Sequence, residues 1–287
     1  MIPAAFTYAR PATLDEALGL LSDGAEAKVL AGGQSLLPLL KLRLAGAARL
    51  IDIGRIGELR GIRATPDGGT SIGALTTYRE LEDSKLATRY RCLAEALPRI
   101  ADLQVRNRGT IGGSVAHADP ASDMPAVLLA LDATFVARSG TGERRIPAST
   151  FFQGPFQTAL AEGELLTEIV IQPASQELGS AYRKLSQPAS GYSIVGVAAV
   201  VGRAGSKIGT ANIGITGVGD VAYRASAVEK AFIGSDGSAA AIAAAAAHAT
   251  DGQTVASDIH ADGTYRGRMA AVYVRRAIEG ALEALDA

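Results

Sequence analysis

The stretch Leu30-Ala31-Gly32-Gly33-Gln34-Ser35-Leu36-Leu37 joins a short strand predicted at Lys28–Ala31 to an apolar segment that runs from Leu36 to Leu44. Pro38 stands near the start of that segment, where the first turn of a helix tolerates proline. Adjacent glycines let the main chain reach positive φ and remove the Cβ atoms that would block a phosphate group. The stretch therefore predicts a sharp turn whose backbone N–H groups point at one anion.

A second glycine pair follows some eighty residues later, in Thr110-Ile111-Gly112-Gly113-Ser114. Thr110 and Ser114 place a hydroxyl on either side of the pair, while Arg106 and Arg108 raise the local positive potential. Because one exposed contact of this kind contributes only roughly 0.3–1 kcal/mol, a diphosphate site needs several that act together, and the free amide hydrogens of both pairs are expected to converge on one diphosphate. Either pair alone is more often an ordinary turn between elements, and spacing leaves that alternative open.

The first motif lies inside a strand–helix–strand unit predicted for residues 1–54. Thr13 and Glu16 form a capping-box signature, and the apolar residues after Thr13 recur at helical spacing. Leu50–Ile53 is typical of a second, buried strand.

The second motif lies in a mixed unit predicted for residues 55–176. Strands are predicted at Ser71–Gly73, Thr134–Ala137 and Leu165–Gln172, and helices after Thr77 and at Leu86–Ala101 and Asp123–Leu131. Val105–Ser114 is basic and glycine-rich and is predicted to be irregular. The polar stretch Pro173–Gly179 marks the end of this unit.

The remaining residues, 177–287, change from strands to helices. Three antiparallel strands are predicted at Tyr182–Ser186, Ile194–Val201 and Lys207–Thr216, followed by helices at Ala225–Ile233, Ser238–Ala249 and Gly263–Leu285. Strands followed by helices are typical of a separate α+β domain.

Composition excludes several kinds of chemistry. A chain of 287 residues is long enough for two packed units, and a net charge of −1 offers no basic surface for nucleic acid. Cys92 is the only cysteine and the three histidines lie far apart, so no metal or iron–sulfur site is expected in this chain. No apolar stretch reaches membrane-spanning length and Met1–Arg10 has no secretory pattern, so a cytoplasmic location is expected.

Two longer stretches resemble a known family. LAGGQSLLPLLKLRLA at Leu30–Ala45 and QVRNRGTIGGSVAHADPASDMP at Gln104–Pro125 are similar to the FAD-binding medium subunit of the molybdenum hydroxylases, which include carbon monoxide dehydrogenase, quinoline oxidoreductase and xanthine dehydrogenase. The resemblance extends from FTYARPATLDEALGLL to YRGRMAAVYVRRAI, which is nearly the whole chain.

The resemblance implies an α+β fold. Its first part is a two-subdomain FAD-binding domain of the vanillyl-alcohol-oxidase/PCMH type, for which residues 1–176 are expected, with subdomains at about 1–54 and 55–176. Its second part, residues 177–287, is expected to hold a three-stranded antiparallel sheet and a helical bundle.

The resemblance also implies which residues contact the cofactor. Those around the FAD diphosphate and ribityl chain are Leu30, Ala31, Gly32, Gly33, Gln34, Ser35, Leu36, Leu37, Thr110, Ile111, Gly112, Gly113 and Ser114. Asp123 matches an acidic cofactor contact, Leu166 a position beside the ring, and Lys184 a basic contact to its polar edge. Ile100 falls where xanthine enzymes have an aromatic residue, and Tyr192 where other members place a tyrosine over the ring. Gln34 and Ser114 replace a histidine and an asparagine of some relatives and keep hydrogen-bonding ability.

Each of these side chains also has an ordinary structural interpretation. Leu166 would be apolar in any core, and Lys184, which alternates with apolar residues, could face water. Asp123 could be a plain helix N-cap, Tyr192 a surface aromatic residue, and His117 a hydrogen-bonding spacer beside the second motif.

By resemblance, this chain has no catalytic base for the substrate of its complex. A large partner subunit would oxidise the substrate at a molybdenum–pterin centre, and a small iron–sulfur subunit would deliver the electrons to FAD, in a dimer of heterotrimers. One alternative is a non-catalytic scaffold that binds FAD weakly or not at all. Another is a stand-alone flavin reductase or oxidase, which would need an acid or cysteine near the ring, whereas Cys92 lies in a predicted helix.

Overall fold

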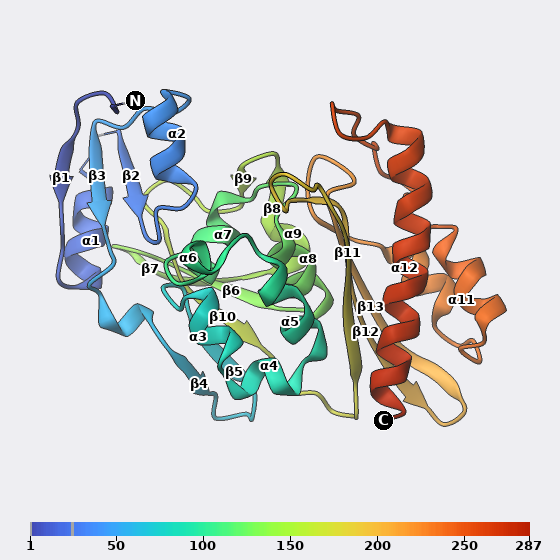
Figure 1. The fold of residues 1–287 in the computed structure, drawn as a ribbon. Coiled ribbons are helices and arrows are strands. Elements are labelled where there is room, and N and C mark those ends of the chain that lie inside the picture. Colours follow the sequence, from blue (N-terminus) through green and yellow to red (C-terminus); the bar gives the residue numbers. More distant parts are fainter. Residues whose placement is uncertain (1, 24–25) are drawn as a thin grey trace.

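The computed structural model describes residues 2–23 and 26–287. The first unit is a parallel sheet in the order β1-β3-β2, shown at the blue end of Figure 1. Its elements are β1 (Thr7–Ala9), α1 (Leu14–Leu21), β2 (Ala27–Leu30), α2 (Leu36–Leu42) and β3 (Arg49–Asp52). The predicted capping box is confirmed, because Thr13 Oγ1 accepts the N–H of Glu16 and the Glu16 carboxylate accepts the N–H of Thr13.

The second unit is an antiparallel sheet in the order β4-β5-β10-β6-β7, surrounded by short helices. Its strands are β4 (Ile62–Ala64), β5 (Thr70–Gly73), β6 (Thr134–Ser139), β7 (Gly142–Pro147) and β10 (Leu165–Ile171), with a small hairpin of β8 (Phe152–Gly154) and β9 (Gln157–Thr158). Its helices are η1 (Gly57–Leu59), α3 (Tyr78–Glu82), α4 (Lys85–Arg89), α5 (Arg91–Ala96), η2 (Leu97–Arg99), α6 (Leu103–Arg106), α7 (Ile111–His117), α8 (Asp123–Ala130) and α9 (Ala148–Phe151).

Two predictions about this unit were wrong. The single helix expected at Leu86–Ala101 is broken, because Tyr90 takes an extended conformation with φ −115° and ψ 100° and Pro98 tightens the end into a 3₁₀ turn. The stretch expected to be irregular, Val105–Ser114, contains the end of α6 and the start of α7. Thr110 caps α7 by accepting the N–H of Gly113 on its hydroxyl, at 3.1 Å.

The third unit has four antiparallel strands in the order β11-β12-β13-β14, where three were expected. They are β11 (Gly179–Ser186), β12 (Ser193–Ala204), β13 (Lys207–Thr216) and β14 (Tyr223–Arg224), followed by α10 (Ser226–Phe232), α11 (Ala239–Ala246) and α12 (Gly263–Leu285). The fourth strand has only two residues, so it is too short to show a period of two in the sequence.

The four-stranded sheet is covered on both faces. Helices α5 and α8 pack between it and the five-stranded sheet, and α10 to α12 lie on its outer face (Figure 1). Residues on β11 therefore alternate between two cores: Tyr182 belongs to the inner core and Ala181 to the outer one. Gly214 allows the close approach of α8, because a Cβ at this position would lie 2.0 Å from the carbonyl oxygen of Ala126.

Within residues 2–23 and 26–287, no helix is both long enough and apolar enough to cross a membrane. No group of three or more histidine, cysteine, aspartate or glutamate side chains in these ranges is placed to hold a metal ion.

Candidate functional site

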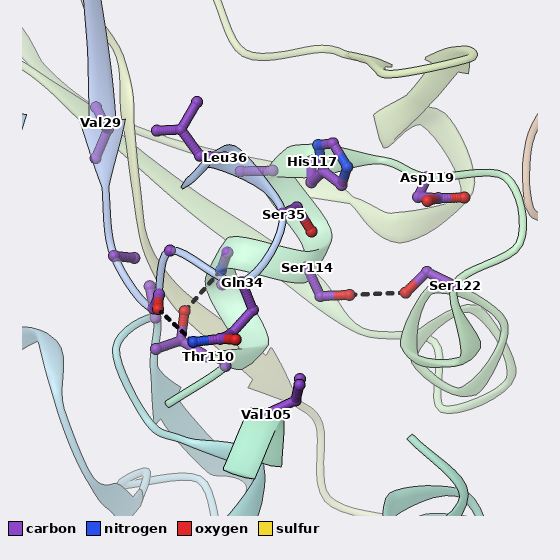
Figure 2. Close-up of a pocket in the computed structure, with 18 of the residues that line it drawn as sticks. Val29, Gln34, Ser35, Leu36, Val105, Thr110, Ser114, His117, Asp119 and Ser122 are labelled. Atoms are coloured by element: carbon purple, nitrogen blue, oxygen red, sulfur yellow. Dashed lines mark hydrogen bonds between the residues drawn. The ribbon is translucent and has the colours of Figure 1, made fainter. Parts of the chain in front are cut away.

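A cavity of about 860 Å³ lies where the three units meet, which is within the usual range for ligand sites. Most of the residues singled out from the sequence line it: Ala31, Gly32, Gly33, Gln34, Ser35, Leu36, Ile100, Thr110, Gly112, Gly113, Ser114, Asp123, Leu166 and Tyr192. Figure 2 shows Gln34 and Ser35 of the first glycine motif facing Thr110 and Ser114 of the second. The fold thus brings two segments that are about eighty residues apart in the chain to one wall.

Four of the expected residues do not line this cavity. Ile111 is fully buried in the core. Leu30 and Leu37 lie against Gly33, because a Cβ on Gly33 would meet a methyl group of each, at 3.2 and 2.9 Å. Lys184 lies behind the wall, where its ammonium group meets Asp123.

The first glycine motif packs against main-chain atoms of the two residues that precede the second motif. A Cβ on Gly32 would lie 2.3 Å from the carbonyl oxygen of Arg108 and 2.9 Å from the Cα of Gly109. A Cβ on Gly113 would lie 3.9 Å from the Cβ of Ala31. Gly32 is therefore required for the close packing of the two segments, and Gly33, with φ +75°, forms the turn itself.

The first motif presents a row of free donors. Within residues 2–23 and 26–287, the consecutive backbone N–H groups of Gly32 to Leu36 have no acceptor. All five residues line the cavity. Successive N–H groups on a loop with little side-chain bulk form a concavity that suits an anion. Anion binding at this motif stays a prediction.

The second motif is different, and the expectation that its amides are free was wrong. The N–H groups of Ile111 and Gly112 donate to the carbonyl oxygens of Thr76 and Ala74, at 3.0 and 2.9 Å. The N–H of Gly113 donates to its own helix cap. Because these donors are used, the second motif contributes hydroxyl groups and a surface with little side-chain bulk. One of its hydroxyl groups is that of Ser114, whose Oγ lies 2.8 Å from Ser122 Oγ.

Asp123 carries a buried charge at the back of the cavity. Lys184 Nζ donates to its carboxylate at 2.8 Å, Ser193 Oγ donates at 2.9 Å, and the hydroxyl of Tyr182 donates to the same oxygen as Ser193. The N-cap of α8 is Ser122, so the plain-cap interpretation of Asp123 is wrong. The water-facing interpretation of Lys184 is also wrong, because none of its side chain is exposed.

Tyr182 and Ser193 were missed by the sequence reasoning. Tyr182 stands two positions before Lys184 on β11, so a period of two places both side chains on one face, and that was the available signal. Burial, followed by the charge of Asp123, raises the pKa of Tyr182 well above its usual value, so its hydroxyl stays a donor.

Apolar and aromatic side chains line the cavity beyond Asp123. Leu166 is buried, Ile100 is half-buried, and Tyr192 is 45 % exposed on the loop between β11 and β12. His117 lies on the same wall with its ring 5.0 Å from that of Phe156, and burial lowers the pKa of this histidine. A neutral His117 thus adds polarity without charge at neutral pH.

Comparison with known proteins gives the class of this fold, which is that of an FAD-binding subunit of an oxidoreductase. Residues 4–174 match the family described as FAD binding domain in molybdopterin dehydrogenase, and residues 180–281 match the CO dehydrogenase flavoprotein C-terminal domain. The chain belongs to the family of FAD-binding medium subunits of the molybdenum hydroxylases.

Individual relatives cover nearly the whole chain. The carbon monoxide dehydrogenase medium chain of Hydrogenophaga pseudoflava is 41 % identical over 98 % of both chains, and a solved structure of that enzyme superposes with a TM-score of 0.95 over 99 % of this chain and 100 % of that one. The glyceraldehyde dehydrogenase medium chain of Sulfolobus acidocaldarius is 41 % identical over 82 % of this chain and 83 % of its own. Quinoline 2-oxidoreductase from Pseudomonas putida 86 is 34 % identical, with a TM-score of 0.91 over 99 % of both chains.

Proposed function

We propose that this chain binds FAD in the cavity and carries electrons from iron–sulfur clusters of a partner, through the flavin, to an external acceptor. The observation that carries the proposal is the row of free N–H groups from Gly32 to Leu36, packed against a second glycine motif. A diphosphate needs several short donors and little bulk, and this wall supplies both. The two-subdomain arrangement of the vanillyl-alcohol-oxidase/PCMH type, with a domain boundary near residue 176, is part of the proposal.

Each part of the cavity has its own task in this proposal. The first motif binds the diphosphate through its amides, and the hydroxyls of Ser35, Thr110 and Ser114 add further donors. Ile100, Leu166 and Tyr192 flank the ring and exclude water from it. Bound FAD would supply a carrier that exchanges electrons singly or in pairs.

Asp123 and Lys184 have distinct tasks, because only Asp123 lines the cavity. The carboxylate of Asp123 accepts polar hydrogens of the cofactor. Lys184 balances that charge from behind and fixes its orientation, in place of the direct cofactor contact that the resemblance implies.

The names of the relatives support the proposal that this chain has partner subunits. Several are called a medium chain or a subunit of a complex, which supports a heteromeric assembly. Cys92 is the only cysteine, so the clusters would be held by a small iron–sulfur subunit and the molybdenum–pterin centre by a large one. A dimer of such heterotrimers in the cytoplasm is the assembly that we propose.

A glycine substitution tests the binding site directly. Gly32→Ala should remove most of the bound FAD, because the new Cβ would collide with the main chain of Arg108 and separate the two motifs. Gly46→Ala is the matched control, since a Cβ there meets nothing within 4 Å. Flavin absorbance per polypeptide, measured on the chain co-purified with its partner subunits, gives the result.

Three other outcomes would contradict the proposal. Absence of flavin from the wild-type complex would favour the scaffold. Substrate turnover by this chain alone would favour a stand-alone flavoenzyme. Equal flavin content in both glycine variants would place the cofactor elsewhere.

A further inference from the structure

The segment Arg99–Ala101 has an unusual main chain for a cavity wall. Ile100 and Ala101 both line the cavity. Ala101 has φ +43°, a left-handed conformation that is unfavourable for a residue with a Cβ. Such a conformation persists only where neighbouring groups hold it.

Three successive carbonyl groups of this segment accept hydrogen bonds from cations. Arg106 Nη1 donates to Ile100 O at 3.0 Å and to Ala101 O at 3.2 Å. From the other side, Lys184 Nζ donates to Arg99 O at 3.2 Å. Both side chains are largely buried: that of Arg106 is 13 % exposed, and that of Lys184 is fully enclosed.

Arg106 is itself held from behind. Its Nε lies 3.6 Å from a carboxylate oxygen of Glu82, and neither atom has a hydrogen-bond partner in the part of the chain that the structure describes. The guanidinium group therefore faces the carbonyls of the segment on one side and a carboxylate on the other. It does not line the cavity, so it is not placed to contact a phosphate group.

We propose that Arg106 is a positioning residue, whose guanidinium group fixes the main chain of Ile100 and Ala101 as a rigid wall at the ring end of the cavity. Lys184 completes this arrangement, which we call the carbonyl clamp, by holding Arg99. Through Lys184 the clamp is also joined to Asp123, so the wall and the acidic group keep one relative position. The inference rests on the proposed function for the identity of the ligand, whereas the clamp concerns this chain alone.

The test compares substitutions at Arg106, Arg108 and Ala101 in the full chain. Arg106→Met removes the clamp but keeps a good helix former in α6, and Arg106→Lys keeps the charge but not the fork of donors. Arg108→Met removes a charge two positions away, on an exposed side chain. The measurements are hydrogen exchange of the peptide over residues 97–105 without FAD, the dissociation constant of FAD, and the visible circular dichroism of the bound flavin.

Arg106→Met should speed exchange of that peptide and weaken FAD binding, each by about tenfold, and should alter the flavin dichroism. Arg106→Lys should lie between Arg106→Met and the wild type, and Arg108→Met should match the wild type in exchange and dichroism. Ala101→Gly should reduce the effect of Arg106→Met on FAD affinity, because glycine takes the left-handed conformation without the Cβ penalty.

Two results would overturn the clamp. One is unchanged exchange of the 97–105 peptide in Arg106→Met or, should that variant not fold, in Arg106→Lys. The other is an equal loss of FAD affinity in Arg106→Met and Arg108→Met, which would show that only charge matters. A wild-type chain that takes up no FAD would contradict the proposed function, while the exchange measurement would still decide the clamp.

Discussion

At the scale of single residues, the carboxylate of Asp123 depends on three donors that come from two neighbouring strands. Tyr182 and Lys184 lie on β11, and Ser193 begins β12. A buried carboxylate is tolerated only when its hydrogen bonds and its charge are both matched. The loss of one donor should therefore be measurable in the stability of the whole chain.

Tyr182→Phe should lower the free energy of unfolding by about 2 kcal/mol, because a hydrogen bond to a buried charged group is lost while the ring stays. Tyr265→Phe, at a tyrosine that is 44 % exposed, should change it by less than about 0.5 kcal/mol. Urea unfolding of both variants and the wild type measures the difference. Equal midpoints for the two variants would show that the Tyr182 hydroxyl does not support Asp123.

At the scale of secondary-structure elements, Glu95 joins α5 to β11. Its carboxylate accepts the backbone N–H of Tyr182 at 2.7 Å and Arg183 Nη1 at 2.6 Å. Burial alone would raise the pKa of Glu95, but the hydrogen bonds from Arg183 and from the Tyr182 backbone outweigh it and hold the pKa below its usual value. A folded-state pKa below that of the unfolded chain gives stability that is present above the unfolded value and lost as the pH falls.

Glu95→Gln should therefore cost about 1–2 kcal/mol of unfolding free energy at pH 7, and the difference from the wild type should shrink below about pH 4. Glu283→Gln, at an exposed position, should show little effect at either pH. Unfolding curves recorded between pH 3 and 7 provide the comparison. A difference that grows in acid would mean that the hydrogen bonds to Glu95 do not control this behaviour.

Elements with a strong apolar period could be predicted from the sequence, and those that depend on tertiary packing could not. The bounds predicted for β13 and α12 agree with the structure, because each element alternates or repeats over ten or more residues. Helix α7 was missed, since two glycines and several polar residues hide the apolar period of a helix that Thr110 caps. Strand β7 was missed because most of its side chains are exposed at a sheet edge, so it shows no apolar alternation.

The site could be predicted in part, for the same kind of reason. The glycine motifs identified the wall of the cavity, because the close approach of two main chains requires glycine, and glycine pairs are visible in the sequence. The role of Lys184 could not be deduced, since alternation along β11 shows which residues share a face but not that helices cover both faces. Arg106 was expected to supply positive potential, and only the folded chain shows its guanidinium turned toward Ile100 and Ala101.

At the scale of the whole molecule, the cavity takes its walls from all three units. Gly32–Leu36 come from the first unit, Leu166 from the second, and Tyr192 from the loop between β11 and β12 of the third. A ligand that fills the cavity must therefore contact residues that lie more than 150 positions apart. Ligands of different length should therefore protect different parts of the cavity wall.

FAD should slow hydrogen exchange both in the peptide that contains Gly32–Leu36 and in the one that contains Tyr192. ADP, which carries the diphosphate without the flavin, should protect only the first. With FAD at about 100 times its dissociation constant, binding should add about 2.7 kcal/mol to the unfolding free energy. Protection near Tyr192 by ADP alone would contradict the orientation proposed for the cofactor.

The four-stranded sheet, buried between α8 on one face and α12 on the other, has a mechanical consequence. Hinge motion between units needs a small or polar interface, whereas these units share a continuous apolar interior that includes Tyr182, Ala198 and Phe135. The second and third units should therefore unfold together, as one calorimetric endotherm. Any cofactor held between them would keep a constant distance to a docked redox partner. Entry and release of the cofactor would then depend on movement of surface loops alone.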